Sequence, residues 1–115
     1  MKRISEFGNV IIAICQYRNI SFAEFGRRIN FTGPYINDLL KGNRKPSINV
    51  INGIVNNMSL LPDETVALYN AYYKATRTLP DEVLDYIYSQ DLIAPLKELA
   101  ISDPTGSIIK NNKQR

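Results

Sequence analysis

The chain has 115 residues, the size of one ordinary domain. Apolar residues make up 44% of it and charged residues 22%, a composition typical of a globular protein with a real core. No apolar run approaches the roughly 20 residues of a membrane span, and the apolar run at residues 10–15 is too short for a signal peptide. We therefore expect a cytoplasmic protein with no membrane contact.

The residue types that most often carry chemistry are scarce. The chain has no histidine and a single cysteine, Cys15. A disulfide within the chain is therefore impossible, a zinc site lacks ligands, and catalytic triads built on a histidine base are excluded. Cys15 lies in a helical apolar pattern, which favours a small buried hydrophobic residue over a reactive thiol. We expect no metal, no cofactor and no enzyme.

Positive charge is concentrated in the first two thirds of the chain. The net charge is +3 and the pI is about 9.1. Residues 1–78 contain ten Lys/Arg and five Asp/Glu, whereas residues 79–115 contain four and six. Such a local surplus is typical of a surface that meets nucleic acid, although many proteins that carry one bind none.

Apolar residues recur at helical spacing along the whole chain, and no segment alternates with the period of two that a strand requires. We therefore predict an all-α fold. Phe7, Ile11 and Ile14 form the inner face of the first helix, and Asn19 is its stop. The expected helices cover about residues 4–18, 22–29, 33–41, 47–58, 62–77, 80–89 and 92–100.

The stretch SFAEFGRRINFTGPYINDLLKGNRKP predicts two short helices joined by a tight corner. Ser21 caps the first helix, and Glu24 three residues later has the spacing of a capping box. Asn30 can end that helix, because asparagine tolerates a positive φ. Thr32 caps the second helix and Gly42 ends it. Two such helices form the unit that fits the major groove of B-DNA.

The outward side of the second helix is the candidate reading surface. The residues expected at base edges are Thr32, Gly33, Pro34, Tyr35, Asn37 and Asp38. Glycine and proline offer no side-chain donor, so direct readout falls on Tyr35, Asn37 and Asp38. Asparagine can pair with adenine, and aspartate can accept from cytosine.

A second set of residues is expected at DNA phosphates, which position a protein without reading sequence. These residues are Ser21, Phe22, Lys41, Asn43, Arg44 and Lys45. Arg44 and Lys45 could instead belong to an ordinary loop. Arg27 and Arg28 are interpreted as a solvated face rather than a contact. The tyrosines of the fifth helix, Tyr69, Tyr72 and Tyr73, favour core or a dimer interface over base stacking.

Several of these features resemble the Xre-type, lambda-repressor-like helix-turn-helix family. They are Ala23-Glu24-Phe25, the corner that ends in Thr32, Tyr35-Ile36, and the run from Lys41 to Ser47. The resemblance covers about residues 4–75 and implies a five-helix domain that binds operator DNA as a dimer. Residues 61–99 also resemble a C-terminal helical extension of small regulators from prophages and other mobile elements.

The sequence departs from the family pattern at three places. Leu40 stands where the family often has glutamate, and Gly26 and Asn30 replace the usual alanine and glycine. Gly26 is small where two helices must approach closely, so this change is compatible with the motif. Gly33-Pro34 reduces base readout, which gives DNA shape a larger share of specificity.

These features together predict a sequence-specific transcriptional regulator, a repressor that binds a two-fold operator as a homodimer. The dimer interface is expected on the helices at about 62–77 and 80–89. The predicted parts are a DNA-binding domain at 1–78, a helical extension at 79–101 and a flexible tail at 102–115. The alternative is an antitoxin-like or adaptor module that uses the same fold to hold a protein partner. The sequence indicates no ligand pocket.

Overall fold

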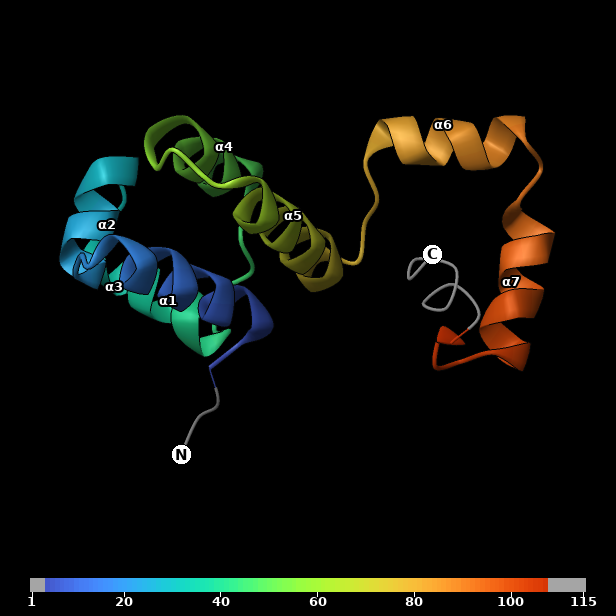
Figure 1. Cartoon of the computed structure of the whole chain (residues 1–115), viewed down its shortest axis with the longest axis horizontal. Coiled ribbons are helices and arrows are strands. Elements are labelled where there is room, and N and C mark those ends of the chain that lie inside the picture. The colour runs from blue at the N-terminus through green and yellow to red at the C-terminus, as the bar shows by residue number, and fades with distance from the viewer. Residues whose placement is uncertain (1–3, 108–115) are drawn as a thin grey trace. The chain divides into compact units, whose positions relative to one another are not determined.

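Every regular element of the protein is an α-helix within residues 4–107, the range that the computed structural model describes (Figure 1). The helices are α1 (Glu6–Arg18), α2 (Phe22–Ile29), α3 (Gly33–Lys41), α4 (Ile48–Asn57), α5 (Pro62–Thr76), α6 (Asp81–Ser89) and α7 (Ile93–Ser102). The all-α prediction is confirmed. The helix ends differ from the expected positions by at most two residues, the uncertainty usual for frayed ends.

The described residues divide into two units between Thr78 and Leu79. The first unit contains α1–α5 and the second contains α6 and α7. Every buried hydrophobic residue among those described lies in the first unit, from Phe7 to Ala71. Neither α6 nor α7 has a buried residue. The hydrophobic core therefore belongs to the first five helices alone.

In the first unit, α1 packs against α3 and α5, α2 packs against α3 and α4, and α4 packs against α5. The predicted inner residues Phe7, Ile11 and Ile14 are buried, as are Ile36, Leu39 and Leu40. Cys15 is also buried, as expected, and burial raises the pKa of its thiol to about 11. Because Ile36, Leu39 and Leu40 hold one face of α3 in the core, the opposite face of the helix is exposed to solvent.

The first four helices start at hydroxyl caps and end where the local sequence indicated. In each, the cap oxygen accepts the N–H three residues on; the caps are Ser5, Ser21, Thr32 and Ser47. Asn19, Asn30 and Gly42 adopt the left-handed conformation at the ends of α1, α2 and α3, with φ of 53°, 66° and 76°. These caps satisfy backbone groups that a helix end leaves without partners.

The reciprocal capping box predicted for α2 is wrong. The hydroxyl of Ser21 accepts the N–H of Glu24 at 3.0 Å, which is half of the motif. The carboxylate of Glu24 instead accepts from Arg27 at 2.7 Å and from Arg28 at 3.0 Å. Both guanidinium groups lie one turn further along the helix, and a charge-assisted bond is stronger than a bond to a neutral N–H.

Two glycines allow helices to approach at backbone distance. A Cβ atom on Gly26 would lie 2.8 Å from the carbonyl oxygen of Phe31 in the corner between α2 and α3, and 3.4 Å from the Ile36 side chain on α3. A Cβ atom on Gly8 would lie 2.9 Å from the Cα of Leu40, which presses α3 against α1. The Leu40 carbonyl also accepts the N–H of Ser5 at 2.9 Å. The apolar Leu40 side chain is 6% exposed and belongs to the core.

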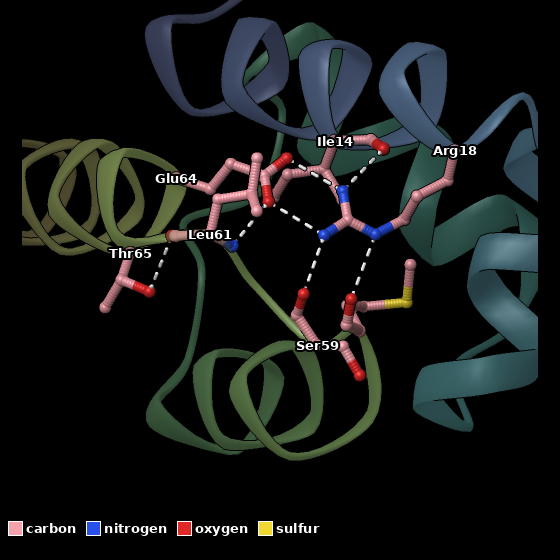
Figure 2. Close-up of polar contacts among 7 residues, drawn as sticks. Ile14, Arg18, Ser59, Leu61, Glu64 and Thr65 are labelled. Atoms are coloured by element: carbon pink, nitrogen blue, oxygen red, sulfur yellow. Dashed lines mark hydrogen bonds and ion pairs between the residues drawn. The ribbon is translucent and has the colours of Figure 1, made fainter.

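A single arginine fixes the start of α5 (Figure 2). Arg18, at the end of α1, donates two bonds of 2.7 Å to the carboxylate oxygens of Glu64. Its N–H groups also donate to the backbone carbonyl oxygens of Ile14, Met58 and Ser59. Glu64 in turn accepts the N–H of Leu61 at 2.9 Å. The bond from Arg18 lowers the pKa of the Glu64 carboxyl, and the network joins α1, the α4–α5 loop and α5.

The second unit differs in detail from the expected elements. α6 begins at Asp81, and Pro80, which was expected inside the first turn, is the N-cap residue before the helix. α7 extends to Ser102, so the predicted tail at 102–115 starts inside a helix. Asp103 then closes a turn, in which its carboxylate accepts the N–H and hydroxyl of Ser107 at 3.2 and 2.9 Å. Residues 108–115 of the predicted tail lie outside the described residues. No helix within 4–107 is long and apolar enough to cross a membrane.

Candidate nucleic-acid interface

The outward face of α3 and the loop after it carry ten of the twelve residues predicted at DNA. Of the full set, only Tyr35 and Asp38 are half-buried, and the others are exposed. Thr32 accepts the N–H of Tyr35 at 3.3 Å, so its hydroxyl acts as the cap of the helix. A Cβ atom on Gly33 would meet nothing within 4 Å. The first turn of α3 is therefore an open surface with little side-chain chemistry.

Tyr35 is held from both sides. Its ring stacks on Phe31 with centroids 4.9 Å apart and an interplanar angle of 22°. The guanidinium carbon of Arg44 lies 5.2 Å from the Tyr35 ring centroid. A stacked guanidinium keeps its in-plane N–H groups available to a phosphate. The structure thus brings together one predicted base reader and one predicted phosphate contact, and the tyrosine positions the arginine.

Two groups of basic residues in the first unit differ in how their charge is compensated. Lys41, Arg44 and Lys45 are exposed, and none of the ion pairs found within residues 4–107 includes them. Arg27 and Arg28 instead share the carboxylate of Glu24, whose pKa their hydrogen bonds lower.

This difference agrees with the expected assignment of the two groups. On α2, Arg27 and Arg28 are exposed and share one carboxylate, which offsets one of their two positive charges, and this is consistent with a solvated face. Apart from Arg77 at the end of α5, the described cations of the first unit that have no ion pair lie at the end of α3 and in the loop that follows.

The remaining predicted residues take two different positions. Asn43 lies in the basic loop, and its N–H donates to the carbonyl oxygen of Asp38 at 2.9 Å, which fixes the loop against α3. Ser21 and Phe22 lie at the start of α2, and no hydrogen bond within the described range joins them to α3. The structure therefore assembles one continuous candidate surface on α3 and its loop, with a second element at the start of α2.

Two other expectations concern residues away from this surface. Tyr69 and Tyr72 on α5 are partly buried and pack against the core, which favours the core interpretation over base stacking. No group of three or more His, Cys, Asp or Glu side chains within residues 4–107 could hold a metal ion. Gly8 and Arg18, which position α3 and α5, were not identified from the sequence.

No protein-family model, no curated protein and no solved structure matches the chain.

Proposed function

We propose that the chain is a sequence-specific DNA-binding transcriptional regulator of the Xre, lambda-repressor-like type. In this proposal α1–α5 are the five-helix domain, α2 lies across the DNA backbone and α3 enters the major groove. The observation that carries the proposal is the uncompensated charge of Lys41, Arg44 and Lys45, at the exposed end of a helix whose inner face is locked into the core. Such a regulator acts in the cytoplasm, where its DNA is.

The contacts divide by their physical role. Lys41, Arg44 and Lys45 bind phosphates, and the start of α2 offers backbone N–H groups to a further phosphate. Asn37 is exposed and Asp38 half-exposed, and these two residues discriminate between bases. The open surface at Gly33-Pro34 allows the DNA backbone or groove wall to approach α3 closely, which favours readout of shape.

We further propose a homodimer on a two-fold operator, acting as a repressor. One recognition helix buries too little DNA for tight specific binding, whereas two copies reach half-sites one helical turn apart. The α6 and α7 helices support a role in this dimer. They have nine and ten residues, none of them buried, and helices so short are marginal in water without tertiary contacts.

The exposed apolar residues of the second unit supply the contact surface for a second copy. The large ones on α6 and α7 are Val83, Tyr86, Tyr88, Ile93, Leu96 and Ile101. The interface expected from the sequence included the fifth helix, but Leu68 and Ala71 of α5 are buried in the core of its own unit. We therefore assign the dimer contact to α6 and α7. Sedimentation of the full chain and of a Tyr86→Asp, Ile93→Asp variant tests this: the variant should be monomeric.

A salt titration of DNA binding tests the main proposal. Labelled DNA flanking the chain's own gene should bind better than random DNA, with log K falling linearly with log salt concentration. Replacing both Arg44 and Lys45 by alanine should weaken binding to every sequence and reduce that slope by about 2 per protomer, because each phosphate contact contributes about 0.9. The matched control replaces Arg27 and Arg28, which also carry two charges but share the carboxylate of Glu24, and should change the slope less.

A separate substitution tests sequence specificity. Asn37→Ala should change which sequence is preferred rather than lower affinity for all of them, with a loss of about 1–3 kcal/mol at one base pair. If the chain binds the flanking DNA no more tightly than random DNA, the proposal is wrong.

The alternative is an antitoxin-like or adaptor module. The observation in its favour is the same uncovered apolar surface of α6 and α7, which a different protein could cover. It predicts no preference for the flanking DNA and a stable complex with a partner protein in which α6 and α7 become protected from hydrogen exchange.

A further inference from the structure

A cavity of about 350 Å³ opens beside the basic loop, at a place where the sequence indicated no ligand pocket. Its walls come from the start of α1, the end of α3 with the loop that follows, and the second half of α5. Its floor lies over the core residues Phe7, Leu39 and Ala71, each at most 3% exposed, and most of the exposed surface that lines the cavity is apolar. The volume is at the lower end of the range for small-molecule sites.

The rim of the cavity is positively charged. Arg44, Lys45 and Lys74 line it, and Glu6 is the single carboxylate among the lining residues. Glu6 and Lys74 face each other at 3.3 Å, but their side chains are 60% and 70% exposed, so this ion pair is weak. Arg44 and Lys45 have no carboxylate partner within the described residues. The cavity thus combines an apolar floor with a net surplus of cations.

This combination selects a class of ligand. A DNA phosphate or an inorganic anion would satisfy the cations of the rim but would leave the apolar surface that lines the cavity uncovered. A neutral apolar molecule would cover the floor and leave the cations without a partner. An organic anion with an apolar body satisfies both, because burial of apolar surface and charge pairing then act in the same complex.

We propose that this cavity binds a small organic anion with an apolar body, and that its occupancy weakens DNA binding. The first part stands on the cavity alone, whereas the second rests on the proposed function. Arg44 and Lys45 belong both to the rim and to the surface assigned to phosphates. A ligand carboxylate that engages these two cations competes with DNA for them, and the coupling is reciprocal, so DNA also weakens ligand binding.

Octanoate is a suitable probe, with acetate, inorganic phosphate and octanol as controls that lack the apolar body or the charge. Calorimetry and amide NMR shifts of the full chain, without DNA, should show saturable octanoate binding with the largest shifts around Phe7 and Leu39. The controls should bind at least tenfold more weakly. Equal binding of acetate or phosphate would show a general anion site, and no saturable binding of octanoate would show an empty surface depression; either result overturns the proposal.

Two variants of the rim should change octanoate affinity in opposite directions. Non-specific detergent action would not produce such opposite changes. Lys74→Ala removes a cation and should weaken octanoate binding about two- to fivefold, whereas Glu6→Gln removes the competing carboxylate and should strengthen it by a similar factor. Lys97→Ala, on α7 and outside the cavity, is the charge-matched control.

A bulky residue in the wall tests the location. Ala75→Trp places an indole in the cavity and should abolish octanoate binding, while Asn70→Trp on the exposed side of the same helix should not.

A separate experiment measures the effect of octanoate on DNA binding. Saturating octanoate should weaken binding to the preferred DNA several-fold in the parent chain and leave it unchanged in the Ala75→Trp variant. Octanoate binding with unaltered DNA affinity would overturn the regulatory part alone. If the parent chain binds no preferred DNA at all, the proposed function fails, and the calorimetry still decides the cavity.

Discussion

Replacing Arg18 by alanine tests how the first unit is held together. Among the described residues, only the Arg18 side chain forms hydrogen bonds with α1, with the α4–α5 loop and with α5 (Figure 2). The substitution removes two bonds to Glu64 and three to backbone carbonyl oxygens. It leaves Glu64 with the N–H of Leu61 and no cation nearby.

The size of the effect follows from the burial of the pair. Both side chains are 13% exposed, so water screens the charges much less than at a surface pair. A surface pair contributes about 0–1 kcal/mol, and breaking a buried pair by removing one partner costs about 3–5 kcal/mol. For this partly buried fork we expect Arg18→Ala to lower the free energy of unfolding by about 2–3 kcal/mol. In a unit of this size that is a fall in Tm of roughly 10–20 °C.

Urea unfolding followed by circular dichroism measures this loss, and its pH dependence identifies the cause. Arg18 holds the pKa of the folded-state Glu64 carboxyl below its ordinary value of 4.5. The stabilisation is therefore fully present above that value and is lost as the pH falls through the lowered pKa. The difference between parent and variant should shrink at acidic pH. Arg27→Ala, which breaks an exposed pair on α2, is the control and should have no measurable effect.

A loss below about 0.5 kcal/mol, the usual range of surface substitutions, would refute the reasoning. So would a loss of the same size at neutral and acidic pH, because the ion pair would then not be its source.

Two further predictions concern the packing of α1. Gly8→Ala should destabilise the fold by about 1–3 kcal/mol in the same urea assay, because the added methyl group overlaps the backbone of Leu40. Gly33→Ala meets open space and should be neutral or slightly stabilising; equal losses for the two variants would contradict the packing described for α1 and α3. The Cys15 thiol, buried and with a pKa of about 11, should react with a disulfide reagent at mildly alkaline pH only as fast as the fold opens. Reaction at the rate of a free cysteine in the folded chain would show that the residue is accessible.

The features that the sequence alone predicted correctly are local ones. Ser21, Thr32 and Ser47 cap their helices, and Asn19 and Gly42 end theirs, because a cap or a left-handed stop depends on groups within one turn of the chain. The inner faces followed in the same way from the spacing of apolar residues. The outward position of the candidate DNA surface is a consequence of that spacing, because the face opposite the core must meet solvent. Its function stays a prediction.

Two features depend on interactions that the sequence pattern does not decide. Glu24 has both a backbone N–H and two guanidinium groups within reach, and only the folded geometry shows that the arginines take its carboxylate. The α6 and α7 helices have the expected amphipathic spacing, yet spacing alone does not reveal that no residue of either helix is buried. The sequence places the dimer contact on α5 and α6, whereas this observation favours α6 and α7.

The sequence by itself determined where helices form and which side of each is apolar, because those properties depend on residues three or four positions apart. The tertiary structure decided which helices meet and what lies between them. The contact of Gly8 with Leu40 and the bonds from Arg18 to Glu64 join residues more than thirty positions apart, and the cavity is lined by residues of α1, of α5 and of the loop after α3. Such contacts depend on the path of the whole chain, and no local pattern encodes them.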